Sequence, residues 1–482
     1  MDTRTKIVAT LGPASRSPEV LDAMLRAGTD VVRLNLSHGT LDEHLEALAA
    51  VRAAADRVGQ VVAVLADLPG PKVRSGRFPE GGVELRGGAA VRLRAGQPGG
   101  DDSSDAQCIT VDYPSMAHDL HPGDRVVLGD GAISLVVDSI TGDDVCCTVA
   151  TGGRVQGRPG VHLPSARMRL TTPTDDDIRL GRAMAEAGAD FLAVSFVRRA
   201  HDLRVLREAI APHTTALVAK IETMSAVDDL PDIAAEADAV MVARGDLGIE
   251  CPLEDVPHLQ KHIVRHCVEQ GVPVITATQM MESMITAPSP TRAEVSDIAN
   301  AVFDGTDALM LSAETAIGAD PAEVVATMNR IANRAEQEAG YRQWAARLGR
   351  TQRRHWPDGP HRITLAITHA ASLAADDAAA EAIICCTRSG GTARAMARFR
   401  PAAALIGVSP DPVTVRTLAL TWGVTPVHMD NFATIDELVW HAVEGCVKGG
   451  LVSHGQTVLV LAGAPDRPSG ASTDVLRIVR IS

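Results

Sequence analysis

Eight short apolar runs, each followed by a stretch with helical periodicity, constrain the fold of this 482-residue chain. The runs are nearly continuous in Val, Ile, Leu and Ala, which is typical of parallel strands that are buried on both faces. Because an open sheet of that length often curls or splits, eight strand–helix units favour closure into a barrel. We therefore predict an α/β fold centred on a (β/α)8 TIM barrel, with the strands KIVAT, DVVRLNL, VVAVLADL, FLAVSF, ALVAKIE, AVMVARGD, PVITATQ and ALMLSAET.

Polar side chains close each of these runs. The carboxyl ends of the strands in such a barrel meet at one rim, where these folds place their chemistry. We therefore expect one site to be surrounded by the polar residues Thr10, Arg33, Asn35, Asp67, Ser195, Lys220, Glu222, Arg244, Asp246, Thr278, Gln279, Ser312 and Glu314.

The fifth and sixth runs carry the charges that point to a specific chemistry. Side chains alternate along a strand, so Lys220 and Glu222 share one face. An isolated pair of this kind is commonly a surface salt bridge. The next run, however, ends in the same way with Arg244, Gly245 and Asp246. Glu222 and Asp246 could then meet over one divalent cation, with Lys220 left to face an anionic substrate.

A long segment between Asp67 and Phe191 interrupts the strand–helix repeat. Its runs VELRGG, AVRLRAG, CITVDY, RVVLGDG, AISLVVDSI and DVCCTVATGG alternate polar and apolar residues and are broken by Gly, Asp and Pro. This pattern predicts a small all-β domain inserted after the third strand. Because it follows a strand on the polar rim, we expect it to act as a lid over the site.

A smaller open α/β domain is predicted at the C-terminus. The last barrel helix should end near Ala339, and Arg347–Arg354 followed by Pro357–Pro360 is typical of a linker. Beyond it, RITLAIT, AAEAIICCT, AALIGVS, VTPVHM, TVLVLAG and LRIVRI alternate with helical patterns. The predicted boundaries are 1–71 and 168–345 for the barrel, 72–167 for the lid and 346–482 for the C-terminal domain.

Composition excludes several classes of function. A formal net charge of −14 and 2% aromatic residues argue against a general nucleic-acid binder. The eight cysteines show no C-x-x-C spacing, which favours free thiols over a disulfide framework or a zinc site. Neither a secretion signal nor a membrane span is found, so we expect a soluble, cytoplasmic protein.

Two loops in the C-terminal domain suggest an anionic ligand. TRSGGT, residues Thr387, Arg388, Ser389, Gly390, Gly391 and Thr392, follows a strand and opens a helix, which is an arrangement that favours phosphate. Pro468–Thr473 could close on it from the other side. The alternative is that both are ordinary tight turns.

Taken together, several segments identify the chain as similar to the pyruvate kinases over nearly its whole length. They are TKIVATLGPAS, RLNLSHG, AKIE, ARGDLGIE, ITATQMMESMI, PTRAEVSDIANAVFDGTDALMLSAETA and TRSGGTAR, and their order adds to their specificity. The resemblance implies transfer of the phosphoryl group of phosphoenolpyruvate to ADP in glycolysis, followed by protonation of the enolate. It also implies a homotetramer, and the loop Thr387–Thr392 supports the hypothesis of an allosteric effector that is a phosphorylated metabolite, a sugar or a nucleotide.

The resemblance assigns roles to residues of the rim. Glu222 and Asp246 would bind Mg²⁺ or Mn²⁺, and Lys220 would neutralise charge on the phosphoryl group in transfer. Arg33 would hold the same phosphate with its guanidinium.

The remaining roles concern the substrate carboxylate and the nucleotide. Backbone N–H groups at Gly245 and Asp246 would bind the substrate carboxylate, and Thr278 would lie near it and near the route of enolate protonation. The alternative for Thr278 is a satisfied hydroxyl inside the barrel. His38 and Arg74 match positions on the ADP side.

The chain departs from the family at the site of a monovalent cation. The resemblance places this ion on Asn35, Ser37, Asp67 and the carbonyl of Leu68. Members that depend on the cation carry Glu in the following G-P-E motif, whereas this chain has Lys72 there. An ammonium could supply the charge of K⁺ and would repel a second cation, so we predict that K⁺ is dispensable. Alternatively, Lys72 points to solvent and the pocket still binds K⁺.

A second departure lies in the lid, and two rival functions follow from the same residues. Pro159 replaces the usual Lys of the lid, and Arg158 could take over its phosphate contact, although a shift of one residue along a strand faces the other way. One rival is a metal-dependent aldolase or lyase that acts on an enolate. The other is a catalytically silent sensor of a phosphorylated metabolite.

Overall fold

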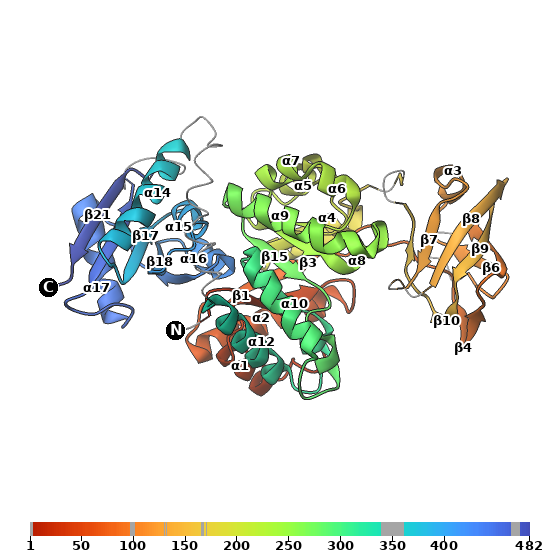
Figure 1. Cartoon of the computed structure of the whole chain (residues 1–482), viewed down its shortest axis with the longest axis horizontal. Helices are drawn as coiled ribbons and strands as arrows, with labels where there is room; N and C mark the ends of the chain where they lie inside the picture. The colour runs from red at the N-terminus through yellow and green to blue at the C-terminus, as the bar shows by residue number, and fades with distance from the viewer. Residues whose placement is uncertain are drawn as a thin grey trace.

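A closed parallel barrel stands between two smaller domains in the computed structural model (Figure 1), which describes residues 3–96, 102–129, 131, 133–164, 168–169, 171–338, 361–463 and 473–482. The strands close in the order β1-β16-β15-β14-β13-β12-β3-β2, which confirms the predicted TIM barrel. They are β1 (Lys6–Thr10), β2 (Val31–Asn35), β3 (Ala63–Asp67), β12 (Phe191–Val194), β13 (Ala216–Ile221), β14 (Ala239–Ala243), β15 (Val274–Ala277) and β16 (Ala308–Leu311).

Helices surround the barrel, and several begin and end at residues that satisfy their terminal backbone groups. Thr40 and Glu43 form a capping box at the start of α2, and Gly59 ends that helix in the left-handed region with φ 70°. The helices are α1 (Pro18–Arg26), α2 (Leu41–Val58), α4 (Asp175–Glu186), α5 (Ala200–Ala209), α6 (Met224–Asp228), α7 (Leu230–Glu236), α8 (Arg244–Glu250), α9 (Val256–Gln270), α10 (Arg292–Asp304), α11 (Ala313–Ala316) and α12 (Pro321–Glu336), with 3-10 turns η2 (Leu253–Asp255) and η3 (Glu282–Ile285).

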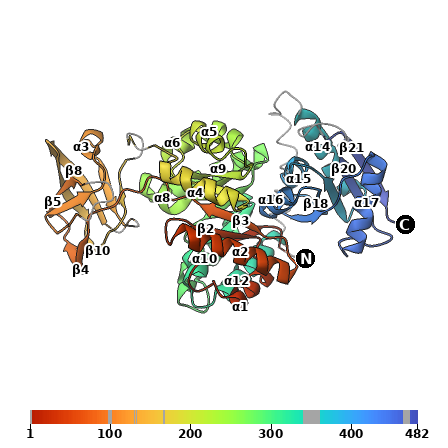
Figure 2. The same cartoon turned by 180° about the vertical axis from the view of Figure 1, so that it is seen from behind.

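The insertion after β3 forms an all-β domain, as the sequence predicts. One sheet pairs β10 with β4, and a second has the order β11-β7-β8-β9-β5-β6 around a separate apolar core. Its elements are β4 (Phe78–Leu85), β5 (Ala90–Ala95), β6 (Cys108–Val111), α3 (Met116–Asp119), β7 (Arg125–Leu128), β8 (Ile133–Thr141), β9 (Asp144–Thr151), β10 (Gly153–Gly157) and β11 (Val161–His162). Seen from both sides, the insert domain lies at one end of the molecule (Figures 1 and 2).

The C-terminal domain lies at the opposite end (Figure 2) and has the sheet order β19-β18-β17-β20-β21. The first four strands are parallel, and β21 runs antiparallel to β20. Its elements are α14 (His361–Asp377), β17 (Ala382–Cys386), α15 (Gly391–Ala397), β18 (Ala404–Ser409), α16 (Pro412–Thr417), η5 (Leu418–Leu420), β19 (Val424–His428), α17 (Ile435–Lys448), β20 (Thr457–Ala462) and β21 (Val475–Arg480). The predicted linker and the predicted helix end near Ala339 lie outside the described residues.

One predicted strand of this domain is wrong, because RITLAIT forms the first half of helix α14. Its β-branched residues suggested a strand, but the buried positions Thr368, Ala371 and Ala375 recur at helical spacing. The Thr368 hydroxyl also donates to the carbonyl of Thr364, 2.8 Å away, as expected within a helix. The Ala-rich continuation of the run therefore decides its conformation.

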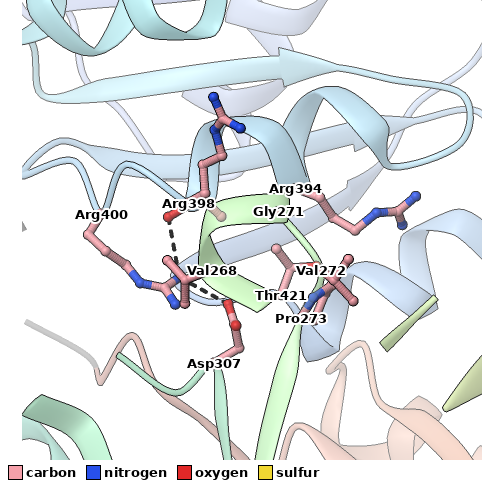
Figure 3. A pocket seen from close by; sticks show the side chains of 10 residues that line it. Val268, Gly271, Val272, Pro273, Asp307, Arg394, Arg398, Arg400 and Thr421 are labelled. Atoms are coloured by element: carbon pink, nitrogen blue, oxygen red, sulfur yellow. Dashed lines mark hydrogen bonds and ion pairs between the residues drawn. The ribbon is translucent and has the colours of Figure 1, made fainter. Parts of the chain in front are cut away.

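The amino-terminal ends of the barrel strands form the lower rim of the barrel. Buried carboxylates join this rim to the C-terminal domain. Asp190 precedes β12, accepts the backbone N–H of Val64 at 2.7 Å, and pairs with Arg52 of α2 and Arg416 of α16, each at 2.7 Å. Asp307 precedes β16 and pairs with Arg400 at 3.0 Å (Figure 3). Each carboxylate thus ties a barrel strand to the C-terminal domain.

Residues of η5 complete the core inside the barrel. Ala419 and Leu420 are buried in the same apolar cluster as the inward-facing side chains of the strands, among them Val8, Met241 and Met310. The C-terminal domain therefore closes the lower end of the barrel. Across the described ranges, no helix is long and apolar enough to cross a membrane.

Candidate active site

A cavity of about 470 Å³ lies between the insert domain and the carboxyl ends of the barrel strands, which form the upper rim. From the insert side, Gly160, Val161 and His162 line it. The predicted residues that share this cavity are Arg33, Asn35, Ser37, His38, Asp67, Lys72, Arg74, Lys220, Glu222 and Asp246. Leu68, Gly245 and Thr278 lie outside its lining.

Lys220 is held by three neighbours at the end of β13. Its Nζ donates to Ser195 Oγ at 2.7 Å and lies 2.9 Å from Glu222 Oε1 and 3.2 Å from Asp67 Oδ1. Burial by itself would lower the pKa of Lys220, but Asp67 and Glu222 outweigh it and raise that pKa. The ammonium therefore stays charged, and its three N–H bonds have fixed directions.

Asp67 links this lysine to Arg33. Nε and Nη2 of Arg33 both lie 2.7 Å from Asp67 Oδ2, and Nη1 donates to Thr10 Oγ1 at 3.1 Å. Burial would raise the pKa of Asp67, but Lys220 and Arg33 lower it. Two cations are thus fixed side by side on one buried carboxylate, which is an arrangement suited to a multiply charged anion.

The surroundings of Glu222 disfavour its charged form. Burial and the neighbouring charge of Asp246 raise its pKa to about 7, against the opposing effect of Lys220. Its Oε2 accepts the backbone N–H of Phe196 at 2.6 Å, and Phe196 has a φ of 55°. A bulky residue in this region is a strained backbone feature, here used to orient a carboxylate.

Glu222 and Asp246 fit a divalent ion in part. A cation bound by both side chains would offset the effect of Asp246 on the charge of Glu222. In the described part of the chain, no group of three or more His, Cys, Asp or Glu side chains could hold a metal by itself. This donor set suits Mg²⁺, which is commonly held by one or two carboxylates together with substrate oxygens and water.

The residues predicted to bind the substrate carboxylate, Gly245 and Thr278, form hydrogen bonds with each other and with the neighbouring backbone. The Gly245 N–H donates to Thr278 Oγ1 at 2.9 Å, and the Thr278 hydroxyl donates to the carbonyl of Ala277 at 2.6 Å. Thr278 and Gln279 both have positive φ, of 70° and 54°. Arg244 holds the turn by donating to the carbonyl of Thr278 at 2.6 Å. The Gly245 N–H is therefore engaged by a protein partner in this structure.

Lys72 reaches the predicted monovalent-cation pocket. Its Nζ donates to Ser37 Oγ at 2.7 Å, while the Ser37 N–H donates to Asn35 Oδ1 at 3.2 Å. The carbonyl of Leu68 accepts the Ser195 hydroxyl at 2.7 Å. Although the Lys72 side chain is exposed, partial desolvation and then Lys220 and Arg74 lower its pKa.

On the predicted nucleotide side, His38 and Arg74 line the cavity, whereas Arg158 of the lid does not. The pKa of His38 is lowered first by burial and then by Lys72, Arg74 and Arg33. Arg158 does not line the cavity, because its Nε donates to the carbonyl of Ser75 at 3.2 Å.

The predicted effector loop opens α15. Gly390 is its N-cap with φ 80°, and Thr414 Oγ1 donates to the carbonyl of Arg388 at 2.8 Å. Thr392 and Thr473 share a hydroxyl hydrogen bond of 2.6 Å, so the end of the second loop contacts the first. Of Pro468–Thr473, only Thr473 lies within the described residues.

The sequence placed Ser195 on the rim without assigning it a role, and it gave no indication of Phe196; both residues line the cavity. A signal for Ser195 existed, because β12 and β13 pair Val194 with Ala219 and so place Ser195 beside Lys220. The hydrogen bond from the Phe196 N–H to Glu222 depends on the positive φ of Phe196, and the residue types in this segment do not predict that conformation.

Comparison with known proteins agrees with the fold and the cavity. Residues 2–325 match the family model described as "Pyruvate kinase, barrel domain", and residues 365–479 match "Pyruvate kinase, alpha/beta domain". The pyruvate kinase of Geobacillus stearothermophilus is 40% identical over 487 residues, covering 100% of this chain and 81% of the relative. Those of Clostridium acetobutylicum (37% identical, 98% of this chain and 99% of the relative) and Mycobacterium tuberculosis (38%, 100% and 99%) are similar over almost their whole length. The chain therefore belongs to the pyruvate kinase family, whose members are phosphotransferases.

Proposed function

We propose that Lys220, Arg33 and the pair Glu222 and Asp246 transfer the phosphoryl group of phosphoenolpyruvate to ADP in this cavity. One observation carries the proposal: Lys220 and Arg33 converge on Asp67, while Lys220 also touches Glu222 at 2.9 Å. Phosphoryl transfer requires fixed positive charge and alignment rather than covalent chemistry from the protein. This site supplies both.

Each protein group has a defined task in this scheme. Lys220 and Arg33 bind the phosphoryl oxygens, and their shared bonds to Asp67 keep them in place while charge redistributes. Mg²⁺ or Mn²⁺ on Glu222 and Asp246 would supply Lewis-acid stabilisation of oxygen charge. His38 and Arg74 face the cavity where ADP phosphates would enter, and Thr278 holds the turn beside Asp246.

Substituting Lys220 with Met tests this assignment. The variant removes the ammonium and keeps an unbranched side chain, so we expect loss of pyruvate formation while phosphoenolpyruvate still binds. Pyruvate formation at the wild-type rate in Lys220→Met would refute the mechanism. An aldolase or lyase would instead act without ADP, and a silent sensor would show no turnover in the wild type.

We further infer that the enzyme works without K⁺. The contact between Lys72 Nζ and Ser37 Oγ supports this, because an ammonium on a pocket hydroxyl supplies positive charge where K⁺ would otherwise bind. The other oxygens of the pocket also have protein partners. Asn35 Oδ1 accepts from the Ser37 N–H, and the carbonyl of Leu68 accepts from the Ser195 hydroxyl. Asp67 pairs with Arg33 and Lys220.

The remaining inferences concern regulation, assembly and location. A phosphorylated metabolite is proposed to activate the enzyme at Thr387–Thr392, where α15 presents its N-terminus. A homotetramer is proposed from the family resemblance, and the exposed apolar side chains of Trp440 and Ile478 are consistent with contacts between subunits. The eight free cysteines support a reducing, cytoplasmic location. The domain boundaries at residues 71, 167 and 345 are likewise proposals.

A further inference from the structure

The two segments that join the insert domain to the barrel run antiparallel to each other beside the cavity at the upper rim. Arg74 and Gly160 are bridge partners, and the Val161 N–H donates to the carbonyl of Val73 at 2.9 Å. Val73 and Val161 are both buried in the apolar core of the insert domain. Because side chains alternate along each segment, the residues on either side of these valines face out of that core.

The face that points out of the core carries Lys72 and Arg74 on one segment and Gly160 and His162 on the other. All four residues line the cavity. The register of Arg74 and Gly160 places Lys72 opposite His162. Among the described residues of the insert domain that line the cavity, none is Asp or Glu. This face therefore presents basic side chains to the cavity, as a site for an anion requires.

Gly160 leaves the space between Arg74 and His162 without a side chain. Within the described part of the chain, the one atom that a Cβ on Gly160 would meet within 4 Å is Nε2 of His162, at 3.7 Å. On the other segment, Arg74 Nη1 donates to the carbonyl of Arg158 at 3.3 Å, which holds the guanidinium across the pair. Because Gly160 itself lines the cavity, Nε2 of His162 lies at the edge of an unfilled part of it.

The position of this space favours ADP over phosphoenolpyruvate as its ligand. Lys220 and Arg33, the proposed anchors of the phosphoryl group in transfer, converge on Asp67 at the strand ends. The second anionic substrate must then be held by basic groups elsewhere in the cavity. Arg74 and His162 supply such groups from the insert side.

We propose that His162 binds ADP by donating from Nε2 to a phosphate oxygen in the space beside Gly160. An imidazole can donate this N–H as the cation or as one of its two neutral tautomers. Arg74 contributes fixed positive charge on the other side of the same space. The inference rests on the proposed transfer to ADP and adds a residue of the insert domain to the nucleotide site.

Calorimetry of ADP binding in the presence of Mg²⁺ tests the contact without turnover. In the full-length protein, His162→Ala should bind ADP about 5- to 50-fold more weakly than the wild type, because a hydrogen bond to a charged group is lost. His162→Gln keeps an N–H donor at the end of its side chain and should retain most of the affinity. His121→Ala, at an exposed histidine of the insert domain, should bind ADP as the wild type does. Equal affinity in His162→Ala and the wild type would overturn the proposal.

Steady-state kinetics separate the two substrates. In His162→Ala the KM for ADP should rise by more than kcat falls, and the KM for phosphoenolpyruvate should stay near the wild-type value. A rise in the KM for phosphoenolpyruvate alone would overturn the assignment to ADP. If His162→Ala weakens ADP binding but the wild type forms no pyruvate, the ADP contact stands and the catalytic proposal fails.

Gly160→Val is a second variant that leaves the histidine in place. Gly160 does not have a positive φ, so its backbone conformation accepts a β-branched residue. The valine side chain would fill the space beside Nε2 of His162 and should also weaken ADP binding. If His162→Ala does not fold, this variant decides, and an unchanged affinity for ADP in Gly160→Val would contradict the proposed site.

Discussion

Replacing Lys72 with Met is expected to make the enzyme depend on K⁺. In the wild type, Lys72 Nζ donates to Ser37 Oγ at 2.7 Å, so the hydroxyl of the cation pocket already faces a positive charge. Methionine keeps the length of the side chain and removes that charge. The Ser37 hydroxyl should then lack a neighbouring positive charge until K⁺ binds beside it.

The size of the effect follows from Coulomb repulsion. A K⁺ ion bound to the same hydroxyl would lie about 4 Å from the ammonium, which at an effective dielectric constant of about 20 costs about 4 kcal/mol. Because the Lys72 side chain is exposed, solvent screening reduces this cost to about 1–2 kcal/mol. Lys72→Met should therefore bind K⁺ about 5- to 30-fold more tightly than the wild type.

The assay compares pyruvate formation in a tetramethylammonium buffer with and without K⁺, coupled to lactate dehydrogenase. The wild type should be fully active in both buffers, whereas Lys72→Met should be slow without K⁺ and recover when it is added. Lys448→Met is the matched control, because Lys448 pairs with Glu444 on the surface of α17, at 2.8 Å. A wild type that requires K⁺, or a Lys72→Met variant that is fully active without it, would refute the reasoning.

Three further predictions test the rest of the site. Ser195→Ala removes the 2.7 Å partner of Lys220 and should lower kcat by about 10- to 100-fold, with a smaller change in KM, because a hydrogen bond to a charged group contributes about 1.5–3 kcal/mol; an unchanged kcat would show that Ser195 does not position Lys220. Because the pKa of Glu222 is raised to about 7, Mg²⁺ must displace a proton from Glu222 when it binds below that pH. The affinity for Mg²⁺, measured by calorimetry, should therefore fall as the pH drops below 7 and level off above it. Equal affinity at acidic and alkaline pH would contradict this. Ser389→Asp places a negative charge in the loop that opens α15 and should abolish activation by phosphorylated sugars or nucleotides in rate curves against phosphoenolpyruvate; a wild type that ignores all such effectors would count against the loop as an effector site.

The barrel could be predicted from the sequence because the apolar run that marks each strand is short and recurs eight times. Strands buried on both faces must be continuously apolar, and the polar residue that ends each run reports its own position at the rim. The sequence alone is therefore enough to place Lys220, Glu222 and Asp246 together at the rim. The same reasoning failed for RITLAIT, where β-branched residues open a helix whose Ala-rich second half packs against the sheet.

Contacts that depend on distant segments could not be predicted. The position of Arg158 follows from the path of the insert domain, which turns its guanidinium to the carbonyl of Ser75. The engagement of the Gly245 N–H follows from positive φ at Thr278, and the orientation of Glu222 follows from positive φ at Phe196. Tertiary packing imposes these conformations, so residue type gives little indication of them.

The closing of the barrel by Ala419 and Leu420 has a consequence for biosynthesis. The ribosome finishes the last barrel strand at Leu311, more than 100 residues before it reaches Leu420. At about 5–20 residues per second, the nascent barrel spends about 5–20 s with its lower end uncovered. During that interval the growing chain presents apolar surface to chaperones and to neighbouring nascent chains. The C-terminal domain thus completes the fold of the catalytic unit as well as carrying its proposed regulatory loop.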